Sequence, residues 1–333
     1  MSAELSERAS PGLASRIAER LIVTPEISLV TALLLFAAVV EIRNPSFFRY
    51  DNLILVLKGA APTFVVAVPM AFVLIGGGID LSVGSVSALA GVVTAMALTA
   101  GIWVPVAIII GLAACALIGL ANGVLTARAR IPALIVTLGA LYFVRGVVLL
   151  MTNGVQIFPL PDGFNVIGQG SLLQVPLLVL YGIAIGIIAH VVLAHSTYGY
   201  RARAVGGNPT AARNAGINVS RIQISLYVLT AVGAGLAGIL TSSYVGVGDP
   251  SAGQGMELGV IAAVIVGGTS LFGAVGSVPG TALGVVLLAV VTNGLLLMSV
   301  SPYFQFVVLG AVVVGAVGID QIRRKRFWRR AAR

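Results

Sequence analysis

The feature that most constrains the fold is a series of long apolar segments that covers most of the chain. A helix that crosses a bilayer needs about 20 predominantly apolar residues, within a range of about 17–25. Ten such segments follow one another, and several of them are short: 27–42, 60–76, 83–101, 104–127, 132–151, 175–195, 221–244, 258–272, 280–299 and 302–319. Membrane barrels are built from shorter, alternating strands, so these runs indicate helices. The sequence predicts an all-α polytopic integral membrane protein with about ten transmembrane helices, eight being the alternative.

Composition supports a membrane class and excludes several others. The chain is 58% hydrophobic and 9% charged, whereas a soluble domain carries about 25% charged residues. The single cysteine, Cys115, lies in an apolar run, so neither a disulfide framework nor a cysteine metal cluster is available. His190 and His195 lie at the end of one apolar segment, where an interfacial position is favoured over metal ligation. We expect no metal site, no bound cofactor and no nucleic-acid partner.

The orientation of the chain follows from where its basic residues gather. Lysine and arginine collect on the cytoplasmic side of membrane proteins, next to anionic lipid. Arginine occurs in both chain ends, in the turn with Arg128 and Arg130, and in the 196–220 loop, although the N-terminal tail also holds four glutamates. The 152–174 and 245–257 loops contain no lysine or arginine. This pattern predicts cytoplasmic chain ends, although 43–58, with three basic residues, opposes it.

The same pattern divides the chain into three parts. Residues 1–26 are predicted to be a cytoplasmic tail rather than a cleaved signal peptide, because no convincing cleavage site follows them. Residues 27–319 form the transmembrane domain, and 320–333 form a basic cytoplasmic tail.

A glycine-rich stretch, Gly76–Gly84, interrupts the apolar pattern. It reads Gly-Gly-Gly-Ile-Asp-Leu-Ser-Val-Gly. Each glycine costs about 1 kcal/mol relative to alanine inside a helix, so the stretch predicts a broken helix. Asp80 would serve as the N-cap of the following helix, with Ser82 as the next candidate. An acid in a broken membrane helix also marks a functional point in many transporters, and both interpretations stay open.

Two short internal matches raise the alternative of two related halves. Gly77–Ser82 resembles 267–272, and Asn122-Gly123 resembles Asn293-Gly294. Glycine pairs four residues apart indicate helix-packing faces rather than a repeat. These pairs are Gly119/Gly123, Gly182/Gly186 and Gly280/Gly284.

The basic loop 196–220 contains a second informative stretch. Asn208-Pro209 is typical of a helix start, with asparagine as the cap and proline in the first turn. Residues 210–215 would form a short helix, closed by Gly216. A short capped helix in a cytoplasmic loop suits docking to a partner protein. A solvated connector held by anionic lipid headgroups is the alternative.

Several enzyme signatures are missing from the sequence. Neither lysine is part of a Gly-Lys-Ser/Thr phosphate loop, and there is no Gly-x-Ser-x-Gly elbow or His-Glu-x-x-His pair. If ATP powers this protein, another chain hydrolyses it. A secondary transporter or channel is the competing class, but only Asp80 could serve it as an intramembrane coupling carboxylate.

Three stretches resemble the permease subunits of ribose-type bacterial ABC monosaccharide importers. They are Gly77–Gly84, Gly206–Asn218 and Glu257–Leu271, and the resemblance extends from about residue 45 to 320. It implies separate ATPase subunits that bind ATP and Mg, a periplasmic sugar-binding protein and a second permease chain. Branched-chain amino acid permeases are the nearer alternative. The resemblance also implies a location in the bacterial inner membrane. The chain departs from the family pattern at three places: Gly259 stands where the family usually has aspartate, Leu296 where it usually has asparagine, and Gly273-Ala274 where it usually has a glycine pair.

The resemblance and the side-chain chemistry together give candidate site residues. The coupling loop would present small residues to the ATPase: Gly206, Gly207, Asn208, Ala211, Ala212 and Gly216. The broken helix and translocation path would use Gly77, Gly78, Asp80, Ser82, Asn122, Asn293 and Gln305, with Thr137 and Asn153 as further candidates. Interhelical hydrogen bonding is the alternative role for the neutral polar residues. Arg145 is expected to snorkel outward or to pair with an acid, Asp162 or Glu257, or Asp80 if depth allows.

Overall fold

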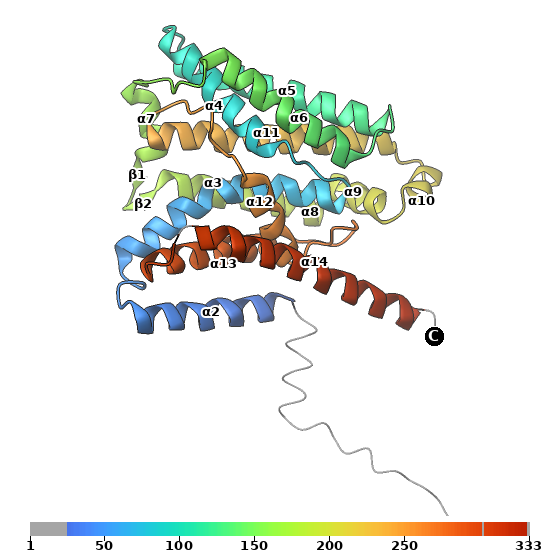
Figure 1. Cartoon of the computed structure of the whole chain (residues 1–333). Coiled ribbons are helices and arrows are strands. Elements are labelled where there is room, and N and C mark those ends of the chain that lie inside the picture. Colours follow the sequence, from blue (N-terminus) through green and yellow to red (C-terminus); the bar gives the residue numbers. More distant parts are fainter. Residues whose placement is uncertain (1–24, 302, 332–333) are drawn as a thin grey trace, which may run out of the picture.

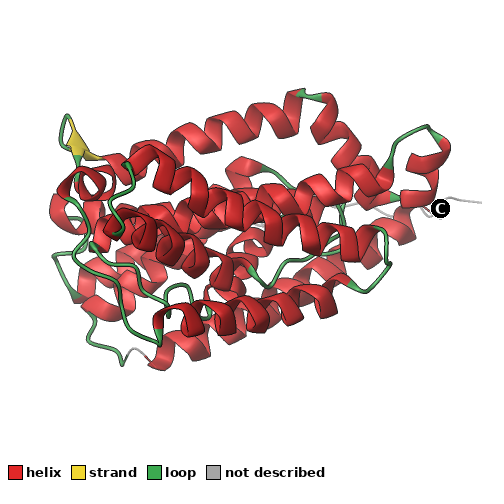
Figure 2. Cartoon of the chain, turned by 90° about the horizontal axis from the view of Figure 1, so that it is seen from above, coloured by secondary structure: helices red, strands yellow, loops and turns green. Residues whose placement is uncertain are grey.

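The computed structural model describes residues 25–301 and 303–331 and shows a helical bundle (Figures 1 and 2). The helices are α2 (Pro25–Arg43), α3 (Tyr50–Ile75), α4 (Val83–Thr99), α5 (Val104–Ala127), α6 (Ala133–Thr152), α7 (Asp162–Gln169), α8 (Leu177–His195), α9 (Thr197–Gly207), α10 (Pro209–Asn214), α11 (Val219–Val245), α12 (Met256–Val266), α13 (Val278–Leu297) and α14 (Tyr303–Ala331). The two strands described, β1 (Ser171–Leu172) and β2 (Val175–Pro176), pair antiparallel in a small hairpin.

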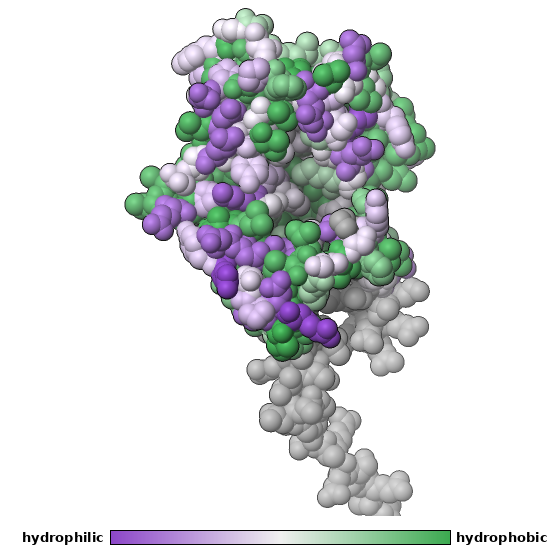
Figure 3. All heavy atoms as spheres, turned by 60° about the vertical axis from the view of Figure 1, so that its left-hand side comes forward, coloured by the Kyte–Doolittle hydropathy of each residue, from purple (hydrophilic) through white to green (hydrophobic). Residues whose placement is uncertain are grey.

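The bundle has two distinct ends. Figure 1 shows α9, α10, the start of α2 and the end of α14 at one end, and α7 with the hairpin at the other. The basic loop and the two described chain ends therefore share a side, as the charge pattern requires. The end that carries the hairpin comes forward in Figure 3, where hydrophilic residues form patches among hydrophobic ones. The predicted tail at 1–26 lies outside the described residues except for its last two positions.

Each of the ten predicted apolar segments overlaps one helix, but 258–272 continues six residues past the end of α12 at Val266. Among the described residues, six helices are long and apolar enough to cross a membrane, namely α3, α5, α6, α8, α11 and α13. Val83–Thr99, Met256–Val266 and Tyr303–Val312 are shorter apolar helices or helix parts. The all-α polytopic class is confirmed, while the count of ten crossings stays a prediction. Helix α14 continues past the expected boundary at 319 without a break.

Close packing around α11 forms the centre of the molecule. Helix α11 contacts α3, α4 and α5, and small residues let the backbones approach. A Cβ atom on Gly119 would lie 2.7 Å from the Tyr227 carbonyl oxygen. Gly186 faces the Phe64 ring, and Gly284 faces the backbone of α12. The predicted glycine packing faces are therefore confirmed.

Two interruptions of the helical pattern lie between packed helices. The first break covers 76–82, between α3 and α4, and the second break covers 267–277, between α12 and α13. Both begin with the same helix end, in which a glycine takes a left-handed conformation: φ is +78° at Gly77 and +90° at Gly268. The next residue donates a backbone hydrogen bond five positions back, from Gly78 to Val73 and from Thr269 to Val264.

The shared helix end corrects the register of the internal match that the sequence suggested. The structural equivalents are Gly77 and Gly268, one position away from the alignment of Gly77 with Gly267. The same pattern also ends α4, at Gly101. The likeness of the two stretches therefore reflects a common glycine C-cap, and two related halves stay a prediction.

Candidate functional site

The short helix expected in the basic loop is present as α10. The Asn208 side chain accepts hydrogen bonds from the backbone N–H groups of Thr210 and Ala211, both at 3.0 Å. Pro209 occupies the first turn, and Gly216 follows the helix with φ of +80°. Asparagine caps well here because its side-chain oxygen satisfies N–H groups that have no partner within the helix. The prediction of a capped helix from Asn208 to Gly216 is confirmed.

The predicted coupling residues divide by exposure. Gly207, Asn208, Ala211 and Gly216 are exposed, whereas Ala212 is buried within the protein. Ala212 therefore holds α10 against the rest of the loop and is not available to another chain. Helical periodicity alone could not show this, because a six-residue helix has too few positions to define a buried face.

Helix α9 joins α10 to the membrane bundle. Asn208 ends α9, donating its backbone N–H to Ala204, and at the same time caps α10. At the other end, the Tyr198 hydroxyl lies 2.9 Å from the Ser225 hydroxyl of α11. Burial raises the pKa of Tyr198, and its hydrogen bond with Ser225 opposes the shift. The two helices therefore form one connected arm, which we call the coupling arm (197–214).

Gly206 lies where the coupling arm meets both helix breaks. A Cβ atom at this position would overlap the carbonyl oxygen of Ile75, the last residue of α3. The same Ile75 oxygen accepts a 2.8 Å hydrogen bond from the backbone N–H of Ala274 in the second break. Gly273 stands against the Gly206 carbonyl with φ of +89°. Only glycine fits at 206, because three backbone segments converge there.

The first break is closed by a buried polar cluster. Asp80 is 0% exposed, and its Oδ1 atom accepts hydrogen bonds from the Ser82 backbone N–H at 2.9 Å and the Ser82 hydroxyl at 2.6 Å. The Asn122 amide of α5 donates to the Ser82 hydroxyl oxygen at 3.0 Å. Gly77 and Gly78 form the turn that precedes this cluster. The cluster ties α4 to α5 and is not open to solvent.

The capping prediction for Asp80 was wrong in position. The N-cap residue of α4 is Ser82, whose side chain makes no capping hydrogen bond to the helix. Asp80 lies two residues earlier and holds Ser82 in a local turn instead. Its Oδ2 atom has no hydrogen-bond partner among the described residues.

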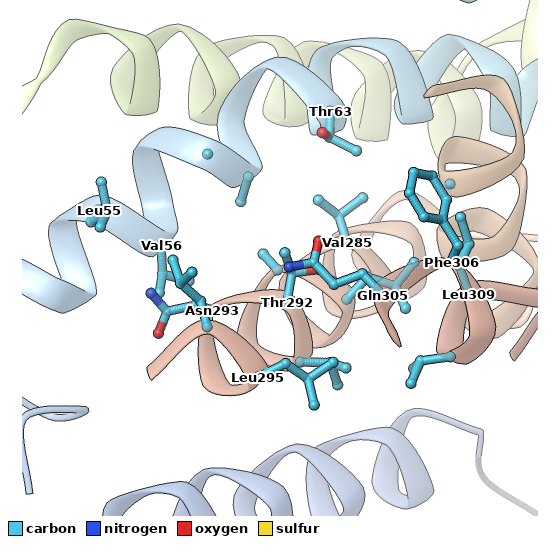
Figure 4. A pocket seen from close by; sticks show the side chains of 18 residues that line it. Leu55, Val56, Thr63, Val285, Thr292, Asn293, Leu295, Gln305, Phe306 and Leu309 are labelled. Carbon is cyan, nitrogen blue, oxygen red and sulfur yellow. The ribbon is translucent and has the colours of Figure 1, made fainter. Parts of the chain in front are cut away.

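The other predicted path residues lie around a separate cavity. This cavity has a volume of about 520 Å³ and lies between α3, α12, α13 and α14. Its polar lining consists of Thr63 on α3, Thr292 and Asn293 on α13, and Gln305 on α14 (Figure 4). The rest of the lining is apolar, and no lining residue carries a charge. Asn293 also exchanges two side-chain hydrogen bonds with Asn52, at 2.9 and 3.1 Å.

The predicted path residues therefore form two groups, not one site. Asp80, Ser82 and Asn122 are joined in the closed cluster, while Asn293 and Gln305 border the open cavity. Two departures from the family pattern, Gly259 and Leu296, line that cavity as well.

Three further candidates lie elsewhere. The Thr137 hydroxyl donates to Ala133 in its own helix, and Asn153 ends α6 in a left-handed conformation. Arg145 donates hydrogen bonds to backbone carbonyls, at 2.6 Å to Pro250 and 3.0 Å to Ala252. Arg145 thus holds the loop that precedes α12 through these carbonyls. The predicted pairing with Glu257 is present as an interaction between the two charges and not as a hydrogen bond among the described residues.

Sequence reasoning missed three contributors to these sites. Asn52 belongs to 43–58, which the charge pattern assigns to an outer loop, but α3 begins at Tyr50 and includes it. Thr63 and Thr292 looked like ordinary apolar-segment residues. Polar residues spaced at the helical period along α3 and α13 could have indicated that one face of each helix lines a cavity. These polar residues are few and lie within long apolar runs, so the pattern is weak. No cluster of three metal-binding side chains occurs in the described part of the chain.

The architecture defines a polytopic α-helical membrane protein with a basic loop that contains a capped helix. The family described as branched-chain amino acid transport system / permease component matches residues 52–317, and the chain belongs to this family.

Curated relatives cover nearly the same span. The chain is 39% identical to the ribose import permease protein RbsC of Escherichia coli K12 over 293 residues, covering 87% of this chain and 91% of the relative. It is 36% identical to RbsC of Bacillus subtilis, covering 87% and 90%. It is also 36% identical to the L-arabinose ABC transporter permease protein AraH of Azospirillum brasilense, covering 90% and 88%. No solved structure matches the chain.

Proposed function

We propose that this chain is the transmembrane permease subunit of an ABC importer for a monosaccharide of the ribose or arabinose type. Relatives named as ribose and arabinose permeases support the sugar class. The observation that carries the coupling part of the proposal is the junction at Gly206, where an exposed docking helix is tied to both helix breaks. A partner that pushes on α10 would thereby act on helices inside the membrane.

The remaining subunits are proposed from the likeness to import permeases. ATP and Mg would bind to separate ATPase subunits, because the sequence contains no phosphate loop. A periplasmic sugar-binding protein would deliver the substrate, and a second permease chain would complete the path in the inner membrane. The chain itself would perform no covalent chemistry, and both ends would lie in the cytoplasm, where the basic loop meets the ATPase.

The cavity between α3, α12, α13 and α14 is our candidate for part of the sugar path. Its amide and hydroxyl side chains can donate and accept hydrogen bonds with sugar hydroxyls without binding a charge. Gly259 and Leu296 make its lining less polar than the family pattern predicts, which supports a difference in substrate or gate from typical members. The closed cluster at Asp80 would shape the path and would not contact sugar.

Branched-chain amino acid import is the second candidate, because the matching family is described by that activity. The two functions predict different substrates for the same assembly, so one uptake experiment distinguishes them.

Reconstitution in liposomes tests the proposal. We expect the purified chain alone to hydrolyse no ATP and to transport neither D-ribose, L-arabinose nor L-leucine. The chain with its ATPase and binding-protein subunits should import one of the two sugars when ATP is supplied. Uptake by the lone chain under an ion gradient would favour a secondary transporter, and ATP-driven leucine uptake would favour the second candidate.

A variant of α10 tests docking within the same assembly. Ala211→Glu places a long charged side chain on the exposed face of α10, so sugar uptake should fall at least tenfold. Ala211→Ser is the matched control, because it leaves a small side chain at the same position. Unchanged uptake by Ala211→Glu in an intact complex would count against α10 as the docking helix.

A further inference from the structure

The second break is held by a side chain from the coupling arm. Arg203 of α9 donates one hydrogen bond to the Gly276 carbonyl at 3.0 Å and another to the Ala274 carbonyl at 3.4 Å. Both acceptors belong to the turn between α12 and α13. The planar guanidinium group can reach two carbonyls at once, whereas a lysine ammonium offers a single compact charge.

Arg203 differs from the other arginines of the loop. It is half-buried, whereas Arg201, Arg213 and Arg221 are exposed. The second break contains no acidic residue, so Arg203 does not have a carboxylate partner there. A half-buried cation that donates to backbone carbonyls has a positional role, because its hydrogen bonds fix the position of the backbone itself and not that of a side chain.

The contact of Arg203 completes a continuous route from α10 to the second break. Asn208 links α10 to α9, and Arg203 lies about one turn before the end of α9. The Ala274 that Arg203 contacts is the residue whose N–H binds Ile75 at the end of α3. Figure 1 shows α9 and α10 together at the end of the bundle where these connections are made.

We propose that Arg203 is the positioning residue that transmits movement of the coupling arm to the second break, and thus to α12 and α13. This inference rests on the proposed function. It adds that the coupling arm acts on the membrane helices through one side chain as well as through backbone packing at Gly206. Without the guanidinium group, α10 could still dock, but the turn at 267–277 would follow it only through the backbone packing at Gly206 and so less closely.

The test uses the assembled importer in liposomes with ATP and labelled D-ribose or L-arabinose. Arg203→Gln should assemble and hydrolyse ATP within about twofold of the unmodified complex, while sugar moved per ATP falls at least tenfold. Arg203→Lys keeps the charge but loses the planar group that reaches two carbonyls, so its sugar moved per ATP should be intermediate. Arg201→Gln is the matched control for charge on the same helix and should behave as the unmodified complex. Equal coupling in Arg203→Gln and the unmodified complex, or equal losses in Arg203→Gln and Arg201→Gln, would overturn the inference.

A second measurement separates this inference from the sugar assignment. Hydrogen exchange of 267–277 is compared with and without a non-hydrolysable ATP analogue on the ATPase subunits, which requires no sugar. Nucleotide should change exchange in both α10 and 267–277 in the unmodified complex. In Arg203→Gln the change should persist in α10 and be much smaller in 267–277. If Arg203→Gln does not assemble, Arg203→Lys decides: a response of 267–277 as large as in the unmodified complex overturns the proposal. Failure of sugar uptake with a normal exchange pattern would contradict only the proposed substrate.

Discussion

The two helix breaks begin alike and are held in different ways. Each starts with a left-handed glycine and the same backbone hydrogen bond across the last helical turn. The first break then closes on its own chain, because Asp80 binds Ser82 two residues later. The second break also has a local hydrogen bond, from the Phe272 N–H to the Ser270 hydroxyl oxygen at 3.2 Å, but this bond is exposed. Ile75 of α3 and Arg203 of α9 hold the second break from outside as well.

This difference assigns the two breaks different roles. A turn that is fixed by its own buried carboxylate keeps its shape when neighbouring helices move. A turn that is fixed by hydrogen bonds from another element moves with that element. The first break is therefore expected to be a rigid wall of the permease, and the second is expected to be the part that responds to the coupling arm.

The largest effect is expected at Gly206, where both breaks meet the coupling arm. Gly206→Ala would force its Cβ into the Ile75 carbonyl, and overpacking of this kind costs about 1–3 kcal/mol or more. Transport should fall more than tenfold, and the thermal unfolding temperature in detergent should drop. Gly207→Ala is the matched control, since its Cβ would meet only the Ala274 methyl at 3.4 Å. Equal unfolding temperatures for the two variants would contradict the inference that close backbone packing requires glycine at 206.

A smaller and more selective effect is expected at Asp80 in the first break. Asp80→Asn keeps an oxygen that can accept from Ser82, whereas Asp80→Leu leaves buried donors without an acceptor, at about 1–3 kcal/mol. The asparagine variant should retain much more transport than the leucine variant. Uptake and unfolding are measured for both. Equal loss of transport in the two variants would instead support a role for the negative charge.

The smallest effects are expected from the hydroxyl groups at the two breaks. Ser277 caps α13 by accepting from the Gly280 N–H, and Ser277→Ala should cost about 1 kcal/mol. Ser82→Ala should cost more, because it leaves the buried Asn122 amide without its acceptor. Unfolding temperatures of the two variants provide the comparison. A larger drop for Ser277→Ala would show that the first break depends less on its polar cluster than we infer.

Features of the coupling arm and the breaks could be predicted wherever the cause is local. Asn208-Pro209 specifies α10 because the cap, the proline and the closing glycine all act within nine residues. The break at 76–82 follows in the same way from its three glycines. The register of the internal match could not be predicted, since several glycines in a row offer more than one position for the left-handed residue.

The candidate sites could be predicted only as residue types. Asn293 and Gln305 do border one cavity, but Asn122 does not join them, because it lies on α5 and faces the first break. The sequence indicated an acid as a partner for Arg145, and Glu257 does interact with its charge, but its hydrogen bonds go to carbonyls of the loop before α12. Both outcomes depend on which helix faces point toward each other, and the long apolar runs carry little information on facing.

The sequence by itself determined that this protein is a bundle of membrane helices interrupted by glycine breaks and served by a capped basic loop. Apolar length, glycine conformation and helix capping act over a few residues, so they can be inferred without a fold. Only the tertiary structure decided that Gly206, Ile75 and Ala274 converge, and that Arg203 rather than an acid holds the second break. Those contacts join segments about 70 to 200 residues apart in the chain, and they depend on backbone packing that no local pattern records.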